Sequence, residues 1–494
     1  MRRVFGYLKD RRREAVLAPL FKLIEASFDL IVPLVVARII NQGIAMGDTG
    51  YIVRQCLLLV LLGAAGLAFS ITAQYFAARA AVGFATKLRH ALFEKIQSLT
   101  FAQLDTVGAS TLLTRMTSDI NQVQSGVNLT LRLFLRSPFI VFGAMAMAFT
   151  IDAKAALVFA VAIPLLCVAV FGIMLWTMPY YRKVQSRLDG VVLALRENLT
   201  GVRVLRAFCR EKQETDAFEE KNQALSRMQL RAGRISALMN PLTYVLVNLA
   251  VLLLVYVGGK RVESGHLVQG DVVALYNYMA QILVELVKLA NLIVTITKAV
   301  ACAGRLESVL AMEPDLQSAL PQAPDAPQAL RGKVEFRDVS LRYPGAGADA
   351  LRSISFCAQP GQTIGVIGGT GAGKSSLVQL IAHFYDATDG TVLVDGCDVK
   401  SLDPAVLRRR IGFVPQKATL FHGTIRENLR WGDPEATEQA LWDALRTAQA
   451  AQLVQEKDGG LDAAVEQGGK NFSGGQKQRL TIARALVRRP EILI

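Results

Sequence analysis

Apolar stretches recur through the N-terminal part of the chain, and they constrain its fold more than any other feature. A helix needs about 20 mostly apolar residues to cross a bilayer, and inside lipid its backbone groups must bond to one another. The stretches lie at residues 15–40, 56–78, 127–150, 155–178, 237–258 and 272–297. The sequence therefore predicts an α-helical membrane domain with six long transmembrane helices over residues 1–312.

The composition and the distribution of charge agree with a membrane protein. The chain is 52% hydrophobic and 19% charged, and its net charge is +14. Lys and Arg gather before the first span, between the second and third, and after the fourth, whereas Lys260 and Arg261 are an exception on the opposite side. Because cytoplasmic loops carry the excess of Lys and Arg, we expect a multi-pass protein of the cell (inner or plasma) membrane with both termini cytoplasmic. The same bias explains the charge with no nucleic acid as a partner.

Seven charged residues fall inside or near the predicted spans. Charge within a membrane is expensive and marks a functional site by default, whereas a wet cavity or a span end is the alternative. The seven are Glu25, Asp29, Arg38, Arg132, Arg136, Glu285 and Lys288. Lys288 follows Glu285 at the i+3 position, where the two can pair. Both interpretations stay open for the acidic residues, and the alternative is favoured for the arginines.

Two polar segments between the spans, residues 101–119 and 197–222, are each placed at the far end of a helical hairpin that projects beyond the membrane. Such a tip can dock on another domain. The alternative is an exposed, solvated helix.

The pattern changes after residues 313–332, which contain four prolines and are predicted to form an extended linker. Strands are expected at residues 334–342, 391–394 and 411–414, with a turn at Asp395-Gly396 between two of them. Residues 333–494 are therefore predicted to form an α/β P-loop domain with some antiparallel strands.

Residues 368–376, GGTGAGKSS, match the pattern G-x-x-x-x-G-K-[ST]. An apolar run at residues 363–367 is the expected strand before the loop, and a helix is expected after it. Glycines let backbone N–H groups surround phosphate oxygens, the lysine reaches the β- and γ-phosphates, and the first hydroxyl holds Mg²⁺. A plain glycine turn is disfavoured, because the flanks, the lysine and the hydroxyl are all in place. The predicted nucleotide-binding residues of this loop are Gly368, Gly369, Thr370, Gly371, Ala372, Gly373, Lys374, Ser375 and Ser376.

Three further sequence features are interpreted together with this loop. Tyr343 ends the first strand and can stack on a purine or fill the core. Gln416 ends the run IGFVPQ and can bind Mg²⁺ and orient water. The segment NFSGGQ opens a helix over residues 476–487, and its predicted ligand residues are Ser473, Gly474, Gly475 and Gln476. A helix N-terminus of this kind binds anions without a lysine of its own.

The P-loop, IGFVPQ and NFSGGQKQR, in this order, resemble the nucleotide-binding domain of ABC transporters. Behind six spans, they resemble a half-transporter of the bacterial multidrug or lipid exporter type, closest to subunits of heterodimeric multidrug exporters. The resemblance implies ATP and Mg²⁺ as cofactors and ATP-driven export of an amphipathic small molecule or lipid from the bilayer by alternating access. It also implies a second half-transporter as partner, with a heterodimer slightly favoured over a homodimer.

The resemblance also implies roles for single residues. Tyr343 takes the adenine-stacking position, and Lys374 and Gln416 are the catalytic residues present, with Ser375 and Gln416 on the metal. Ser473 and Gly475 contact the γ-phosphate of ATP that is bound to the partner. Residues 101–110 and 207–218 correspond to the coupling helices.

Two departures from the family pattern stand out. Phe472 replaces the commoner leucine of the signature and is expected to be tolerated. Residues 491–494 begin the Walker B strand, and the aspartate, catalytic carboxylate and switch histidine expected after it are not in the sequence. The nucleotide domain is therefore predicted to be incomplete and the chain alone nearly inactive as an ATPase. An ATP-gated channel or a catalytically degenerate regulatory half-transporter stays as the alternative function.

Overall fold

The computed structural model describes residues 2–313 and 331–494, and the chain divides into two compact units. We call Met1–Lys95 with Leu113–Ala311 the membrane unit, and Ile96–Leu112 with Met312–Ile494 the nucleotide unit. The first part of the polar tip at residues 101–119 thus belongs to the nucleotide unit, and the part from Leu113 onward belongs to the membrane unit. The predicted linker at residues 313–332 lies almost wholly outside the described residues.

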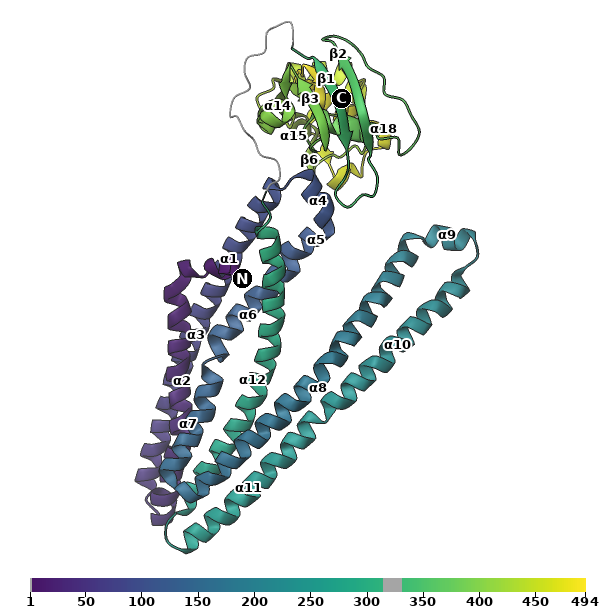
Figure 1. Cartoon of the computed structure of the whole chain (residues 1–494). Coiled ribbons are helices and arrows are strands. Elements are labelled where there is room, and N and C mark those ends of the chain that lie inside the picture. The colour runs from purple at the N-terminus through teal and green to yellow at the C-terminus, as the bar shows by residue number, and fades with distance from the viewer. Residues whose placement is uncertain (1, 314–330) are drawn as a thin grey trace. The chain divides into compact units, whose positions relative to one another are not determined.

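The N-terminal part is helical throughout its described length (Figure 1). Asp152 caps one of the longest helices by accepting a hydrogen bond from Ala155 N at 2.8 Å, which satisfies a backbone donor that the helix leaves open. The helices are α1 (Arg2–Gly6), η1 (Lys9–Arg11), α2 (Arg12–Arg38), η2 (Ile39–Ile44), α3 (Thr49–Ser98), α4 (Phe101–Val107), α5 (Ala109–Thr114), η3 (Arg115–Asp119), α6 (Ile120–Leu133), α7 (Arg136–Ile151), α8 (Ala153–Thr200), α9 (Val202–Ala207), α10 (Glu211–Ala237), α11 (Met239–Glu263) and α12 (Gln269–Leu310).

Two sets of helices pack together in the membrane unit. The helix α12 packs against α2, α6 and α7, and α8 runs beside α10 and α11 (Figure 1). Gly126 permits the closest approach of α6 to α12, because an added Cβ would lie 2.3 Å from the Cβ of Ala299. The shared core holds large buried side chains such as Phe159, Tyr278 and Ile282.

Five helical segments are long and apolar enough to cross a membrane, by length and composition alone and within the described residues. They are Thr49–Ser98, Ala109–Ile151, Ala153–Thr200, Glu211–Glu263 and Gln269–Leu310. The first predicted span is not among them, although it forms the helix α2. Lys22, Glu25 and Asp29 stand close together on this helix and interrupt its apolar run. The prediction of six spans is therefore supported for five.

The exception to the distribution of positive charge has a local explanation. Arg261 donates to the Oδ2 atom of Asp152 from Nε at 3.0 Å and from Nη2 at 2.5 Å. The Lys260 ammonium lies over the ring of Tyr256, 4.6 Å from its centroid. Arg261 is thus neutralised by an acidic partner, and the ammonium beside it is in contact with an aromatic ring.

The nucleotide unit contains a four-stranded antiparallel sheet in the strand order β2-β1-β3-β4. The predicted first strand and the strand at residues 391–394 are confirmed as β1 and β3. The predicted turn between Val394 and Cys397 is confirmed, with φ of 54° at Asp395 and 81° at Gly396, the left-handed pair that tight hairpins favour. The strand β2 was not predicted. The strands are β1 (Val334–Leu341), β2 (Leu351–Ala358), β3 (Asp389–Val394), β4 (Cys397–Asp398), β5 (Ile411–Gly412), β6 (Gly423–Thr424), β7 (Ala464–Val465) and β8 (Ile492–Leu493).

The prediction of a strand at residues 363–367 was wrong. This segment has no regular secondary structure, and none of the sheets in the described part of the chain includes it. A strand exists only through hydrogen bonds to a neighbour, and this segment has none. Its apolar side chains are consequently open to solvent, with Ile364 43% exposed and Ile367 95% exposed.

Two hydrophobic clusters divide the nucleotide unit. The first, which we call the P-loop subdomain, joins β1, β2, β3, α13 and α14 around buried residues such as Phe336, Leu380 and Leu407. The second, the signature subdomain, joins α15 to α18 around Leu441, Leu445 and Leu480. The helices of both are α13 (Lys374–Ile381), η5 (Val399–Ser401), α14 (Pro404–Arg410), α15 (Ile425–Arg430), α16 (Glu438–Thr447), α17 (Ala451–Gln455), η6 (Gly460–Asp462), η7 (Gln467–Gly469) and α18 (Gly474–Val487).

Candidate functional site

The predicted P-loop leads directly into the helix α13. Gly371 and Gly373 have φ of 84° and 82°, a left-handed conformation that glycine adopts without steric cost. A Cβ at Gly373 would also lie 2.6 Å from the Ala350 carbonyl oxygen. The backbone conformation and the close packing both require glycine here, which explains the spacing of the motif.

Lys374 is the first residue of α13, and its Nζ donates to the carbonyl oxygens of Gly368 at 2.8 Å and Gly369 at 2.7 Å. The ammonium therefore lies over the loop that the glycines form. Ser375 is exposed, whereas Ser376 is buried. A cation, a hydroxyl and a helix N-terminus thus meet at one exposed loop, and this combination suits a polyphosphate with its metal ion.

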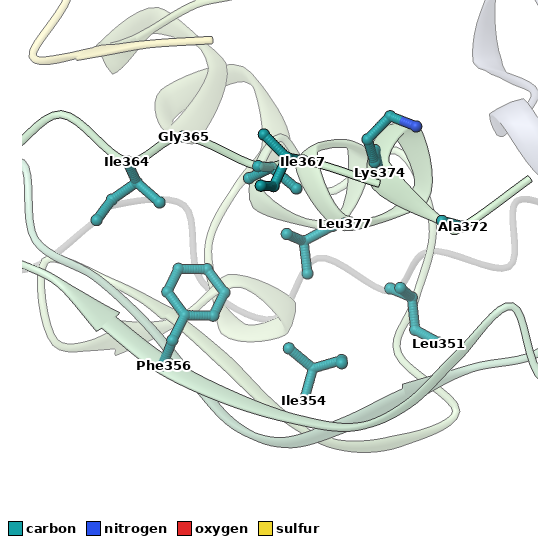
Figure 2. A pocket seen from close by; sticks show the side chains of 11 residues that line it. Leu351, Ile354, Phe356, Ile364, Gly365, Ile367, Ala372, Lys374 and Leu377 are labelled. Carbon is teal, nitrogen blue, oxygen red and sulfur yellow. The ribbon is translucent and has the colours of Figure 1, made fainter. Parts of the chain in front are cut away.

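The hollow beneath this loop has a different character. It has a volume of about 340 Å³, and Ile354 and Phe356 of β2 face Leu377 of α13 across it (Figure 2). The side chain of Lys374 points away from it (Figure 2). The hollow is a mostly apolar gap beside the unpaired segment at residues 363–367, and among its lining residues only Lys374 carries a charge.

Tyr343 lies against the helix that follows the P-loop. Its hydroxyl is 2.9 Å from the Oγ of Ser376, and its ring meets the ring of Tyr385 edge-on at a centroid distance of 5.1 Å. The structure thus brings Tyr343 to the P-loop helix, as its predicted place requires. Its stacking on adenine stays a prediction.

The predicted signature residues form the N-terminus of α18. The Oγ of Ser473 accepts a hydrogen bond from Gln476 N at 3.3 Å, and Ser473 N donates to the Gln476 side chain at 2.8 Å. This reciprocal capping box holds Gly474 and Gly475 as the exposed first residues of the helix. Phe472, the departure from the family pattern, is 5% exposed and packs in the core of the signature subdomain.

The predicted site residues are not all brought together. Gln416 is exposed and follows β5. Within residues 2–313 and 331–494, no hydrogen bond or ion pair joins the P-loop to Gln416 or to Ser473. The P-loop and the signature belong to different hydrophobic clusters. One chain therefore presents two separate candidate anion sites.

A polar tip from the N-terminal part completes the P-loop subdomain. The ring of Phe101, on α4, lies 4.4 Å from the ring of Phe384 between centroids. The hydroxyl of Tyr385 donates a short hydrogen bond to the carboxylate of Asp105. Docking on another domain was predicted for residues 101–119, and the first part of this segment makes a packed contact within the nucleotide unit, which includes Ile96–Leu112.

The tip is connected to the P-loop helix through two tyrosines. Tyr385 bonds Asp105 on the tip, its ring contacts Tyr343, and Tyr343 reaches Ser376 on α13. Burial, followed by the hydrogen bond to Asp105, raises the pKa of Tyr385 above its ordinary value. The sequence analysis missed both Phe384 and Tyr385. Two adjacent aromatic residues just after the P-loop helix were the available signal.

Two family models match the chain, one after the other. The model of the ABC transporter transmembrane region matches residues 16–286, and the ABC transporter model matches residues 351–494. The chain belongs to the ABC transporter family. The transmembrane match covers more than half of the chain, and the second match includes both the P-loop and the signature.

Similar ABC transporters share most of the chain. An uncharacterized ABC transporter ATP-binding protein of Mycobacterium tuberculosis is 40% identical over 99% of this chain and 84% of its own length. An ATP-dependent lipid A-core flippase of Syntrophus aciditrophicus is 30% identical over 82% of this chain and 67% of its length. A fatty acid ABC transporter ATP-binding/permease protein of Mycobacterium bovis is 32% identical over 83% of this chain and 64% of its length.

The second tip of this ABC transporter differs from its prediction. The short helix at this tip is α9 (Val202–Ala207), and α10 begins at Glu211, whereas residues 207–218 were predicted. Gly201 ends α8 and is the N-cap of α9, so the tip begins earlier in the chain. Phe208, which ends it, is 72% exposed.

Proposed function

We propose that the chain is one half of an ATP-driven exporter that moves amphipathic drugs or lipids across the cell membrane by alternating access. The fusion of an ABC transmembrane region with an ABC ATPase domain on one chain carries this proposal. The similarity to a lipid A-core flippase and to a fatty acid transporter supports an amphipathic cargo. The enzyme activity is that of an ABC ATPase coupled to transport.

The P-loop residues 368–376 would bind ATP, and Ser375 with Gln416 would hold Mg²⁺. Two observations support this assignment: the Lys374 ammonium lies over the loop, and the Ser375 hydroxyl is exposed at the helix N-terminus. Hydroxyl and amide oxygens are ligands that Mg²⁺ accepts. The triphosphate supplies the energy for transport, and this chain contributes its binding and orientation.

A second half-transporter would complete the site. The N-terminus of α18 offers backbone donors and a dipole but no lysine, so it suits a phosphate that is already held elsewhere. Ser473 and Gly475 are proposed to contact the γ-phosphate of ATP on the partner. Binding energy that is available only in the dimer can drive closure. A heterodimer is slightly favoured over a homodimer.

We further propose that α2 is the sixth span, in spite of its charges. The helix has 27 residues, or about 40 Å at 1.5 Å per residue, which exceeds the hydrocarbon thickness. Lys22 pairs with Glu25 at 2.5 Å, and Asp29 pairs with Arg136 at 2.9 Å. Charges that are paired within a helical bundle are those a membrane tolerates. Six spans place both termini on one side, which the positive charges assign to the cytoplasm.

Transport requires that nucleotide binding change the conformation of the membrane helices. The tip helix α4 supports such a connection, because it packs on the P-loop subdomain and continues into long helices on either side. We assign to α4 the role of the first coupling helix. The second coupling helix is assigned to α9.

The decisive experiment is ATP-dependent transport into sealed vesicles that contain the chain and its partner. Replacing Lys374 by alanine removes the cation of the P-loop, and we expect ATP binding to weaken more than tenfold and transport to stop. Lys470→Ala is the matched control, because Lys470 is an exposed lysine of the same unit. Uphill movement of a fluorescent amphiphile supports the pump, whereas downhill leakage gated by ATP would support a channel instead.

A further inference from the structure

A network of four charged side chains joins three helices inside the membrane unit. Glu285 of α12 accepts hydrogen bonds from Arg136 at 2.6 Å, Lys288 at 2.9 Å and Ser137 at 2.8 Å. Arg136 of α7 also donates to Asp29 of α2 at 2.9 Å. The predicted pairing of Lys288 with Glu285 is thus confirmed, and it is part of a larger network.

The four side chains differ in how far they are exposed and in how many of their polar atoms have a hydrogen-bond partner. The side chain of Glu285 is 4% exposed and that of Arg136 is 11% exposed, so the centre of the network is closed. The side chains of Asp29 and Lys288 are each 44% exposed. Among the described residues, Asp29 makes one hydrogen bond, with Arg136, and Lys288 makes one, with Glu285, which leaves an acceptor oxygen on Asp29 and two donors on Lys288. The network therefore ends in one open carboxylate and one open ammonium.

Both open groups line the same cavity, which has a volume of about 490 Å³. Such a volume lies in the range of small-molecule sites. Asn277 and Gln281 line it as well, and Pro33 and Val284 give it an apolar part. Its wall thus offers polar groups of both signs beside apolar surface.

The cavity lies well inside the membrane unit along its helices. Arg136 and Glu285 stand about 15 residues, or roughly 22 Å of helix, from the helix ends at Ile151 and Gln269, and Asp29 stands nine residues before the end of α2 at Arg38. A hydrocarbon layer is about 30 Å thick. Each of the two charges is paired once, but the remaining oxygen of Asp29 and the remaining donors of Lys288 face the cavity, and polar atoms at this depth are costly unless water or a ligand bonds to them.

The charge of the network selects the kind of ligand. The two carboxylates and the two cations sum to zero, so a ligand with a net charge would leave an uncompensated charge inside the membrane. A cation at Asp29 alone leaves Lys288 open, and an anion at Lys288 alone leaves Asp29 open. A ligand that carries both signs satisfies both groups and keeps the site neutral.

We propose that Asp29 and Lys288 bind the polar head of a zwitterionic amphiphile, with its amine on Asp29 and its phosphate or carboxylate on Lys288. Arg136 and Glu285 are positioning residues: Arg136 on α7 holds Asp29 of α2, and Glu285 on α12 holds Lys288 of the same helix. This assignment rests on the proposed export function in one respect, because it names the substrate class of the exporter. The binding step itself requires no ATP.

The test is a binding measurement on the purified full chain in an uncharged maltoside detergent without nucleotide. Four probes with the same twelve-carbon chain are titrated: a lysophosphatidylethanolamine, a primary amine, a lysophosphatidic acid and the neutral monoglyceride. Microscale thermophoresis gives the dissociation constant of each. The variants are Asp29→Asn, which keeps the shape of the side chain, and Lys288→Gln, which shortens the side chain but keeps it polar. Each variant removes one charge.

We expect the zwitterion to bind at least tenfold more tightly than the other three probes. Each variant should weaken its binding about tenfold, which corresponds to 1.4 kcal/mol. The primary amine should respond to Asp29→Asn alone, and the lysophosphatidic acid to Lys288→Gln alone. Lys298→Gln is the control, because Lys298 is an exposed lysine of the same helix outside the cavity.

Equal affinities for all four probes, or variants that lower the unfolding temperature without changing zwitterion binding, would overturn the assignment and leave the network with a structural role only. Vesicle transport is measured separately. Charge-selective binding without transport would refute the export function and keep the site. Transport of an amphiphile whose binding ignores both variants would refute the site and keep the exporter.

Discussion

The two polar tips of the N-terminal part are built alike but meet different surroundings. The helix α4 begins with a capping box between Thr100 and Gln103, and the ring of Phe101, although 42% exposed, contacts the ring of Phe384. The helix α9 has no side-chain cap, and Val204 and Phe208 are 60% and 72% exposed. The two short helices thus differ in their surroundings: α4 packs on the P-loop subdomain, whereas α9 leaves its apolar side chains exposed. If the chain is half of a dimer, an exposed apolar tip is what a partner's nucleotide domain would cover.

The contact of the first tip with the P-loop subdomain can be disrupted at its aromatic pair. In Phe101→Ala the stacking on Phe384 is lost, and we expect transport by the paired complex to fall about tenfold, since an aromatic contact contributes roughly 0.5–1.5 kcal/mol beyond its buried area. Binding of a fluorescent ATP analogue should change less than twofold, because Phe101 does not contact the P-loop residues. Phe93→Ala, an exposed phenylalanine on α3, is the control. Unchanged transport in Phe101→Ala would remove α4 from the coupling route.

The second tip allows a test of an exposed side chain instead of a packed one. Phe208→Ala removes an exposed side chain, so the unfolding temperature of the isolated chain should not change. Transport by the paired complex should fall about fivefold, because a buried aromatic anchor is typically a hot spot of an interface. Leu230→Ala, an exposed leucine of α10, should leave both measurements unchanged. A lower unfolding temperature in the isolated chain would show that Phe208 packs within its own chain.

Comparison of the tips also shows which parts of the structure could be predicted from the sequence. Long apolar stretches predicted the membrane helices, and the loop at residues 368–376 was located because it matches the pattern G-x-x-x-x-G-K-[ST]. The position of α9 was missed, since a glycine inside a polar helical pattern does not by itself mark a helix end. The docking surface for α4 was missed because Phe384 and Tyr385 are far from Phe101 in sequence, and no local pattern encodes such a contact.

The expected strand at residues 363–367 failed for a related reason. Its apolar residues favour a buried strand, but a strand also needs a paired neighbour, which only the tertiary structure supplies. Contacts among the charged residues of the spans could be predicted in part. The i+3 spacing of Glu285 and Lys288 predicted their pair, whereas Arg136 could be connected to Asp29 and Glu285 only by the packing of α2, α7 and α12.

The smallest expected effect concerns the hydroxyl of Tyr385, which joins the first tip to its receiving surface. Tyr385→Phe removes the hydrogen bond to Asp105, and we expect a loss of about 1 kcal/mol in the free energy of unfolding near pH 7. For a domain of this size, such a loss lowers the unfolding temperature by about 2–4 °C.

This difference should depend on pH in a defined direction. Because the pKa of Tyr385 is raised from its ordinary value of 10.0 in the folded state, folding favours the protonated hydroxyl. Its stabilising contribution is complete below pH 10 and is lost as the pH rises through the folded pKa. The unfolding temperatures of the unmodified chain and of Tyr385→Phe, measured by differential scanning fluorimetry from pH 7 to 11, should therefore converge above pH 10. The control Tyr244→Phe alters a tyrosine that is 69% exposed and should shift neither curve. A constant difference over this range would mean that the hydroxyl stabilises the tip through packing alone.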